Sequence, residues 1–239
     1  MKKAILFILI LAIAAFPAFS QKIVNDKNAE KRSVESFHGI EVSTGINLIL
    51  TESDAEEVAV SASTTEFRDK IVTKVVSGVL KIHYETKMGA INKPKESKNL
   101  RAYVSYKSLN LLHVNTGAEV EINGILKSPE LEMEVNTGSI VNGEVNIDKL
   151  KVSQNTGSKI TLAGKAMSME IYGDTGSKFS GELLSTNNCS ISVSTGAGVI
   201  ITVENELNAK ANTGGYIKYK GNAGIREIKT NTGGVISKI

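Results

Sequence analysis

The acidic side chains of the C-terminal half are the first candidates for chemistry, because two carboxylates held roughly 5–10 Å apart can cleave a glycosidic bond. Residues 101–239 contain two aspartates, Asp148 and Asp174, and the second stands in a turn motif. Glu132 and Glu134 are two positions apart, which places both on one face of a strand. Such a pair is typical of a solvated face. The sequence therefore predicts no catalytic residues, with a polysaccharide lyase or hydrolase as the alternative.

Side chains that bind metals or cofactors are scattered. His38, His83 and His113 show no ligand spacing, and the single Cys189 excludes an intramolecular disulfide. Cys189 shares its repeat position with large apolar residues, which predicts a place in the core. The glycine-rich turns match neither the G-x-x-x-x-G-K phosphate loop nor the G-G-x-G-x-D calcium repeat. We expect no metal site and no cofactor.

The N-terminus has the pattern of a secretory signal peptide over residues 1–20. Two lysines precede an apolar run over residues 4–15, and Ala18 and Ser20 supply small residues before the expected cleavage after Ser20. Without this segment the formal net charge falls from +3 to +1. That is too little positive charge for a nucleic-acid partner. No later segment is apolar enough to span a bilayer, so the pattern predicts an exported protein without a transmembrane segment, either at the cell surface and associated with the outer membrane or in the periplasm.

Seven near-identical turn motifs must position any functional side chain. Their glycines recur every 18–21 residues, which is the signature of a solenoid. The motif glycines are Gly117, Gly138, Gly157, Gly176, Gly196, Gly214 and Gly233. Thr precedes each glycine. Two positions before each glycine stand Asn115, Asn136, Asn155, Asp174, Ser194, Asn212 and Asn231.

Other positions also keep their character from repeat to repeat. The residues five before and three after each glycine are apolar, and the residue one after it is small. The segments between the turns alternate in polarity, which is a strand signal. This register predicts an all-β fold, a right-handed parallel β-helix with about seven regular coils of 19–20 residues. One outer column alternates in charge from coil to coil and should favour that register: Glu132, Lys151 and Glu170.

The corner chemistry follows from the same motif. Glycine tolerates the positive φ of a sharp bend. Asparagine can bond to the turn backbone and stack its amide on the next asparagine, and threonine can stack equally well. We therefore expect a ladder inside the corner, built from the asparagine or the threonine column. An outward, flat threonine array would instead resemble that of ice-binding solenoids.

The remaining chain divides into an N-terminal tail over residues 21–32, an N-terminal β section over 33–100 and the regular β-helix over 101–239. The section at 33–100 is either an irregular opening or a second small β-helix. It should contain a capped turn or short helix at residues 63–66, a hairpin or two coil strands around Ser77-Gly78 and a linker over 86–99.

The stretch STGINLIL, residues 43–50, repeats the corner with Ile46 where the other copies have a small residue. With the Phe37 and Ile40 opening and the TG repeats, this Gly45-Ile46-Asn47 motif resembles the family called putative auto-transporter adhesin, head GIN domain. The resemblance implies an exported all-β solenoid typical of Bacteroidetes envelopes. If any part of the surface is specialised, the GIN corner is its first candidate; the alternative is a first coil packed against residues 33–100.

Export, a rigid repetitive face and the lack of a catalytic constellation favour a noncatalytic envelope or surface protein, an adhesin-like module. Its ligand is unknown, with a glycan or an envelope polymer as the candidates. A structural or assembly element is a further alternative, because an open β-helix end exposes unpaired strands that a homo-oligomer could cover.

Overall fold

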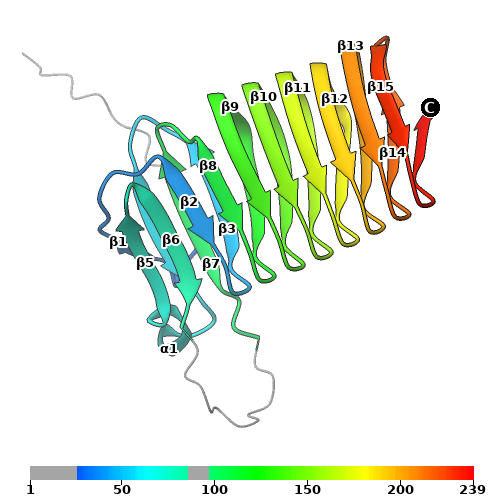
Figure 1. Ribbon diagram of the computed structural model, residues 1–239. Coiled ribbons are helices and arrows are strands. Elements are labelled where there is room, and N and C mark those ends of the chain that lie inside the picture. Colours follow the sequence, from blue (N-terminus) through cyan, green and yellow to red (C-terminus); the bar gives the residue numbers. More distant parts are fainter. Residues whose placement is uncertain (1–25, 86–96) are drawn as a thin grey trace, which may run out of the picture.

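The computed structural model describes residues 26–85 and 97–239. They form a parallel β-solenoid of about seven turns, which confirms the predicted fold class. Figure 1 shows the coils stacked in chain order, with tight turns along one edge. The predicted signal peptide at residues 1–20 lies outside the described residues, as does most of the predicted linker at 86–99.

Five long strands build the regular coils, and each pairs in parallel with its equivalent in the next coil. The strands are β9 (Glu119–Val135), β10 (Ile140–Gln154), β11 (Lys159–Gly173), β12 (Lys178–Val193) and β13 (Gly198–Ala211). The last coils use shorter strands, namely β14 (Tyr216–Lys220), β15 (Gly224–Thr230) and β16 (Val235–Lys238). The predicted charge column is confirmed, because Lys151 pairs with Glu132 and Glu170 in register, and its Nζ lies 2.8 Å from Glu132 Oε1.

The core consists of stacked apolar columns. The column five residues before the motif glycine is at most 1% exposed from Leu112 to Ala209 and breaks only at Ile228 in the last coil, which is 44% exposed. Burying a side chain of this size contributes about 1.5–3 kcal/mol. Cys189 is buried in a neighbouring column, as predicted.

Each corner is a two-residue turn with both central residues in the left-handed region. The motif threonines have φ of 43–60° and the glycines 69–77°, as a type I′ turn requires. The N–H of the following small residue donates to the carbonyl of the residue three before it, for example Ala118 to Asn115 at 3.2 Å. Between coils, the N–H of each corner glycine from Gly45 to Gly214 donates to the threonine carbonyl of the next corner, at 2.9–3.1 Å.

The expected ladder inside the corner is wrong. The threonines of the seven repeat corners are exposed, Thr44 of the GIN corner is half-buried, and the residues before them are half-buried or exposed. The two sheets of a coil converge at so tight a turn that only the small column fits between them. Its members Ala118, Ser139, Ser158, Ser177 and Ala197 are completely buried. The asparagine and threonine columns therefore form an external rim.

In each coil, the wide bend opposite the corner, here called the arc, accommodates the differences in coil length. Among β9–β13, register shifts fall in these arcs, for example between Asn142 and Glu144 and between Gly181 and Ser185. Gly164 shows why some arcs need glycine. Its φ is +104°, and a Cβ there would lie 2.1 Å from the carbonyl oxygen of Val145.

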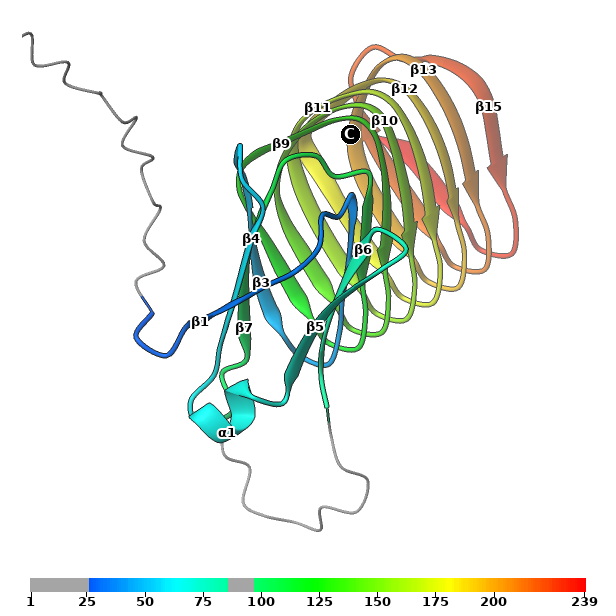
Figure 2. The ribbon, with the colours of Figure 1, turned by 90° about the vertical axis from the view of Figure 1, so that its left-hand side faces the viewer.

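The N-terminal end begins with the GIN corner and then inserts a long segment. β2 (Gly39–Val42) and β3 (Asn47–Glu52) pair in parallel with β8 (Leu111–Val114) and β9, so this corner stacks directly on the first repeat. Residues 53–110 return to add β6 (Val79–Tyr84) to β2, and β7 (Arg101–Tyr106) to β3. Figure 2 shows these strands in front of the stacked coils.

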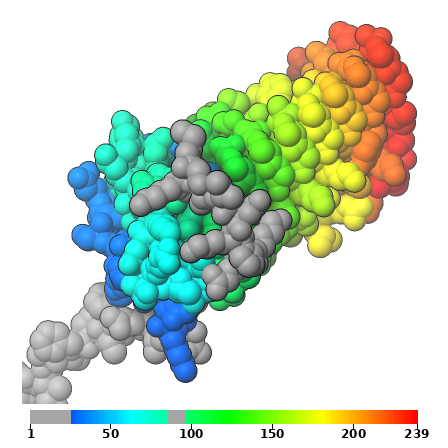
Figure 3. Space-filling model, turned by 90° about the horizontal axis from the view of Figure 1, so that it is seen from below, coloured from blue at the N-terminus to red at the C-terminus, as the bar shows by residue number. Residues whose placement is uncertain are grey.

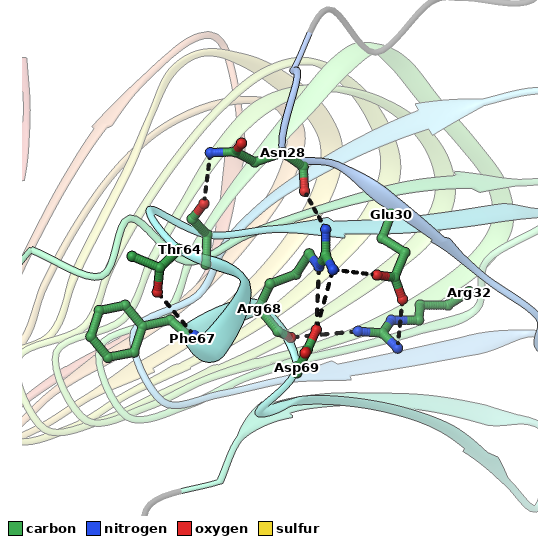
Figure 4. A network of polar contacts seen from close by, with 8 residues as sticks. Asn28, Glu30, Arg32, Thr64, Phe67, Arg68 and Asp69 are labelled. Carbon is green, nitrogen blue, oxygen red and sulfur yellow. Dashed lines mark hydrogen bonds and ion pairs between the residues drawn. The ribbon is translucent and has the colours of Figure 1, made fainter.

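Antiparallel strands then end both sheets. β5 (Ile71–Val76) forms the predicted hairpin with β6, and β4 (Glu57–Ser61) pairs with β7 and with β1 (Glu30–Arg32). The predicted capped turn is the one-turn helix α1 (Thr65–Arg68), capped by Thr64. Arg68 connects this helix to the edge strand, because its guanidinium binds Glu30 at 2.6 Å and the Asn28 carbonyl at 3.4 Å (Figure 4).

Candidate functional site

A groove of about 570 Å³ runs across the outer face of the solenoid beside the corner rim. Its walls are the last residues of β9, β10, β11 and β12 and the corners around them, from Asn115 to Ser194. Because neighbouring coils are ~4.8 Å apart, five successive corners give the groove a length of roughly 19 Å. It can accommodate an extended ligand.

Tyr172 is the one aromatic side chain of the groove lining, and its side chain is 48% exposed. Ser153 and Ser192 are its register partners on the two flanking coils. Because both neighbours are small, neither face of the ring is covered by a large side chain from these positions. An exposed ring between small hydroxyl residues offers an apolar platform with hydrogen-bonding groups at its edges.

Amide and carboxylate groups in and beside the rim form the polar side of the groove, and contacts between neighbouring residues hold them in place. Asn136 Nδ2 donates to Glu134 Oε1 at 2.7 Å, and His113 Nε2 lies 3.7 Å from Glu134 Oε2. Asn155 Oδ1 accepts from the Thr156 N–H at 2.7 Å, which orients that amide. These contacts hold planar polar groups at defined positions along the rim.

Asp174 carries a preorganised negative charge at the middle of the rim. The Thr195 hydroxyl, the Thr175 N–H and the Ser194 hydroxyl donate to its carboxylate and hold the pKa of Asp174 below its usual value. The Thr175 and Ser194 contacts are 2.7 and 2.9 Å. Asp174 therefore acts as a hydrogen-bond acceptor at neutral pH.

Gln154 is a polar residue in an inward column that otherwise holds Val135 and Val193. It is 2% exposed, and its register partner Gly173 has no side chain to fill the same space. Neither polar atom of the Gln154 amide has a hydrogen-bond partner among the described residues. An unpaired buried amide costs about 1–3 kcal/mol. Packing does not explain this residue, which belongs to the groove lining although its side chain lies in an inward column.

The groove brings together five of the seven positions that were predicted to form the corner ladder: Asn115, Asn136, Asn155, Asp174 and Ser194. Asn212 and Asn231 belong to the last two corners and are outside its lining. The motif glycines are exposed and serve the turn backbone. In the GIN corner, Gly45 is exposed and Asn47 half-buried, but Ile46 is completely buried. Its central residue thus belongs to the core of the first coil.

The repeat motif did not indicate the most distinctive residues of the groove, Tyr172 and Gln154. A signal was present in the column four residues before the glycine, where Tyr172 stands between two serines while other coils carry His113, Glu134 or Lys210. Gln154 was a second signal, because the other residues of its column from Val114 to Ala211 are Val, Gly and Ala.

Two other hollows are lined by side chains of mixed charge, including Glu52 with Lys107 in one and Lys149 with Glu170 in the other. Such surfaces are typical of a solvated face. Within residues 26–85 and 97–239, no three His, Cys, Asp or Glu side chains cluster closely enough to hold a metal ion. In the same part of the chain, no helix has the length and hydrophobicity to cross a membrane.

Comparison with known proteins extends these observations. The family model described as putative auto-transporter adhesin, head GIN domain, matches residues 36–223. No curated protein matches the chain. A putative adhesin from Bacteroides fragilis NCTC 9343 has a similar structure, with a TM-score of 0.75, 18% identity, and coverage of 90% of this chain and 98% of its own.

Two further solved structures share the fold. A putative adhesin from Parabacteroides merdae ATCC 43184 gives a TM-score of 0.70 at 14% identity, covering 89% of this chain and 95% of that one. A protein from Parabacteroides distasonis ATCC 8503, described as a putative lipid binding protein, gives 0.64 at 18% identity, covering 90% and 98%. These likenesses establish a common solenoid.

Proposed function

The chain belongs to the family described as putative auto-transporter adhesin, head GIN domain, and from this premise we propose that it is a noncatalytic, adhesin-like binding module of the cell envelope. Export is part of the proposal. It is supported by the two N-terminal lysines, the apolar run over residues 4–15 and the small residues before position 21.

The observation that carries this function is the Tyr172 ring, which projects from a polar groove with serine neighbours on both sides. A tyrosine supplies a large, rigid contact surface at low conformational cost. Binding sites typically combine such a platform with a few fixed polar groups. Here Asn155 and Asp174 provide those groups on the adjacent rim.

The ligand class that fits is a glycan. A sugar ring has an apolar C–H face that can stack on an aromatic ring, and hydroxyl groups at its edge that pair with carboxylates and amides. A groove crossing several coils suits an extended chain of sugars. An acyl chain, the apolar part of a lipid, would instead have to dehydrate Glu134, Asp174 and the amides between them, which is costly.

The enzymatic alternative finds less support. A glycosidase needs one carboxyl group with a raised pKa to act as general acid. The hydrogen bonds to Asp174 shift its pKa in the opposite direction. A structural role in envelope assembly does not require an exposed tyrosine at this position, so the groove favours ligand binding.

The test is a binding screen of the purified protein on an array of bacterial envelope and host glycans, repeated with Tyr172→Ala. We expect the variant to bind at least about tenfold more weakly to any glycan that the parent protein binds, a change of roughly 1.4 kcal/mol. Tyr172→Phe keeps the ring and should retain most of the affinity.

Met167→Ala is the matched control, because Met167 lies on the same strand, is 59% exposed and is outside the groove lining. Circular dichroism should show equal folding of all variants. Equal binding by the parent protein and Tyr172→Ala, or no glycan bound by either, would contradict the proposed function.

A further inference from the structure

The last coil leaves both sheets with an open edge. Within the described chain, β15 pairs only with β13, and β16 pairs only with β14. Figure 3 shows that this coil, in red, forms the far end of the molecule. An unpaired strand edge presents rows of N–H and C=O groups that can pair with a further strand.

The hydrophobic core is also open at this end. Ile225 and Ile228 continue the columns of Leu207 and Ala209, which are completely buried. The two isoleucines are 45% and 44% exposed. Of the nine large apolar side chains that are exposed in the described residues, four belong to residues 224–239. Exposed apolar surface of this kind marks an interaction site.

The opposite end of the solenoid cannot supply the partner. One sheet ends there in β1, which has only three residues, Glu30, Lys31 and Arg32, and each of them forms an ion pair. The other sheet ends in β5, whose edge carries the exposed Lys74. Short charged edge strands oppose further pairing. Stacking the apolar C-terminal end on this end would bury charges against isoleucines, so a head-to-tail filament is disfavoured.

We propose that the partner is a second copy of the chain, joined end to end about a two-fold axis. β15 then pairs antiparallel with the β15 of the second copy, and β16 with its β16. Because the two sheets of a coil face each other, one axis perpendicular to both sheets generates both pairings. The interface is isologous and closed, so association ends at the dimer.

The sequence of β15 is complementary to itself in this arrangement. With the axis between Arg226 and Glu227, each Arg226 lies opposite the second copy's Glu227, and each Ile225 opposite the second copy's Ile228. The faces also agree. A register shift at this point of β15 places Ile225 and Ile228 in inward columns, while Arg226 and Glu227 bind the outward side chains of β13.

The alternative pairing of β15 with the second copy's β16 lacks this match. β16 offers Lys238 as its single charged residue, opposite a strand that contains Arg226, Glu227 and Lys229. Lys238 could pair with Glu227 alone, and Arg226 would have no acidic residue of β16 opposite it, whereas like charges across a strand pair are destabilising. The β15–β15 arrangement gives both Arg226 and Glu227 a partner of opposite charge, and charge complementarity therefore favours it.

Sedimentation velocity of the purified full chain over a range of concentrations tests the proposal. We expect a reversible monomer–dimer equilibrium, with no larger species. Ile228→Lys, which places a charge in the open core column, should shift the protein to monomer. Leu183→Lys adds the same charge at a side chain that is 80% exposed in a distant arc, and it should leave the dimer intact.

Charge reversal gives the sharper result. Arg226→Glu and Glu227→Arg should each raise the dimer dissociation constant about tenfold or more, because each places like charges across the axis. The double variant restores opposite charges between copies and should recover the dimer. Within one chain, however, it places like charges next to Glu206, Lys210 and Lys229, the present partners of these residues.

Recovery in the double variant therefore separates pairing between copies from pairing within one chain. A monomer at all concentrations, a species that grows beyond the dimer, or no recovery in the double variant would overturn the proposal. The experiment is independent of the glycan screen, because none of the substituted residues lines the groove.

Discussion

The two ends of this solenoid finish the same pair of sheets in different ways. At the N-terminal end, the inserted residues 53–110 add one more parallel layer and then switch to antiparallel strands, a hairpin and a helix. At the C-terminal end, the repeat continues with shorter strands through the Gly233 corner, and the last two strands have no outer neighbour among the described residues.

Adding a coil to the stack and ending its two sheets therefore require different sequences. Stacking needs only the repeated register, because each coil has the same apolar and polar positions as the coils on either side of it. Ending a sheet needs side-chain contacts that occur only at that end. Glu30 joins Arg32 at 3.0 Å and Arg68 at 2.6 Å, and no repeat position could supply these contacts (Figure 4).

The largest expected effect compares one substitution at two depths of the same column. Ile171→Ala removes a completely buried side chain in the middle coils and should lower the free energy of unfolding by about 2–5 kcal/mol. Ile228→Ala, at 44% exposure, should cost less than about 1 kcal/mol in the dilute protein. Urea denaturation measures both.

The stability costs of these two substitutions should depend differently on protein concentration. If a second copy covers the last coil, the cost of Ile228→Ala should rise at concentrations where the dimer forms, while that of Ile171→Ala should not change. Equal costs in dilute protein would mean that the last coil is as well packed as the middle ones.

The next largest expected effect is a loss of stability at the N-terminal end of the solenoid. Arg68→Ala removes ion pairs and a hydrogen bond from a side chain that is 19% exposed, and it should destabilise the N-terminal end by about 1–2 kcal/mol. Amide hydrogen exchange should then become faster in β1 and β4, whereas in the parent protein β15 and β16 should exchange first.

Lys31→Ala is the control at the same end. Its ion pair with Glu57 is solvent-exposed on both sides, so exchange in β1 should stay near the parent rate. Faster exchange in both variants would mean that any charge on β1, and not the Arg68 contacts, protects this edge.

The smallest effect is a pH dependence of the closed end. Burial alone would raise the pKa of Asp26, but the Asn28 N–H and the Ser61 and Tyr103 hydroxyls donate to it, Arg101 is nearby, and together they hold the pKa below its usual value. Its contribution to stability is therefore complete above the ordinary aspartate pKa of about 3.9, and is lost as the pH falls through the lower folded value.

Thermal unfolding between pH 2 and 6 should accordingly show a weaker acid dependence in Asp26→Asn than in the parent protein. Glu35→Gln, at an exposed carboxylate, is the control. Identical acid profiles for the parent protein and Asp26→Asn would show that the Asp26 contacts do not form in solution.

The regular coils could be predicted from the sequence because their physical requirement repeats. Columns such as the one from Leu112 to Ala209 are visible without coordinates, since each coil must bury the same positions. The corner was harder to predict. Asn, Thr and Gly all fit a tight turn, and only the geometry of the type I′ turn shows that the small residue faces inward.

The groove escaped prediction for a related reason. Positions that keep the same residue type from coil to coil identify the scaffold, whereas Tyr172 and Gln154 stand in columns where individual coils differ. The closed end depends on contacts between residues far apart in sequence, such as Tyr103 with Asp26 and Arg68 with Glu30. No periodicity reveals pairs of this kind.

The division of each coil into a fixed corner and an adjustable arc has a consequence for how such proteins can diversify. β9 has two more residues between Glu121 and Ile125 than β10 has between Asn142 and Glu144, yet the corners on either side stay in register. Because doubling a loop costs only about 0.6 kcal/mol in closure entropy, whole peptides can be inserted at an arc, for instance beside Leu183. The molecule is therefore a scaffold for loop grafting, in which a peptide inserted at the arcs leaves the register of the corners unchanged.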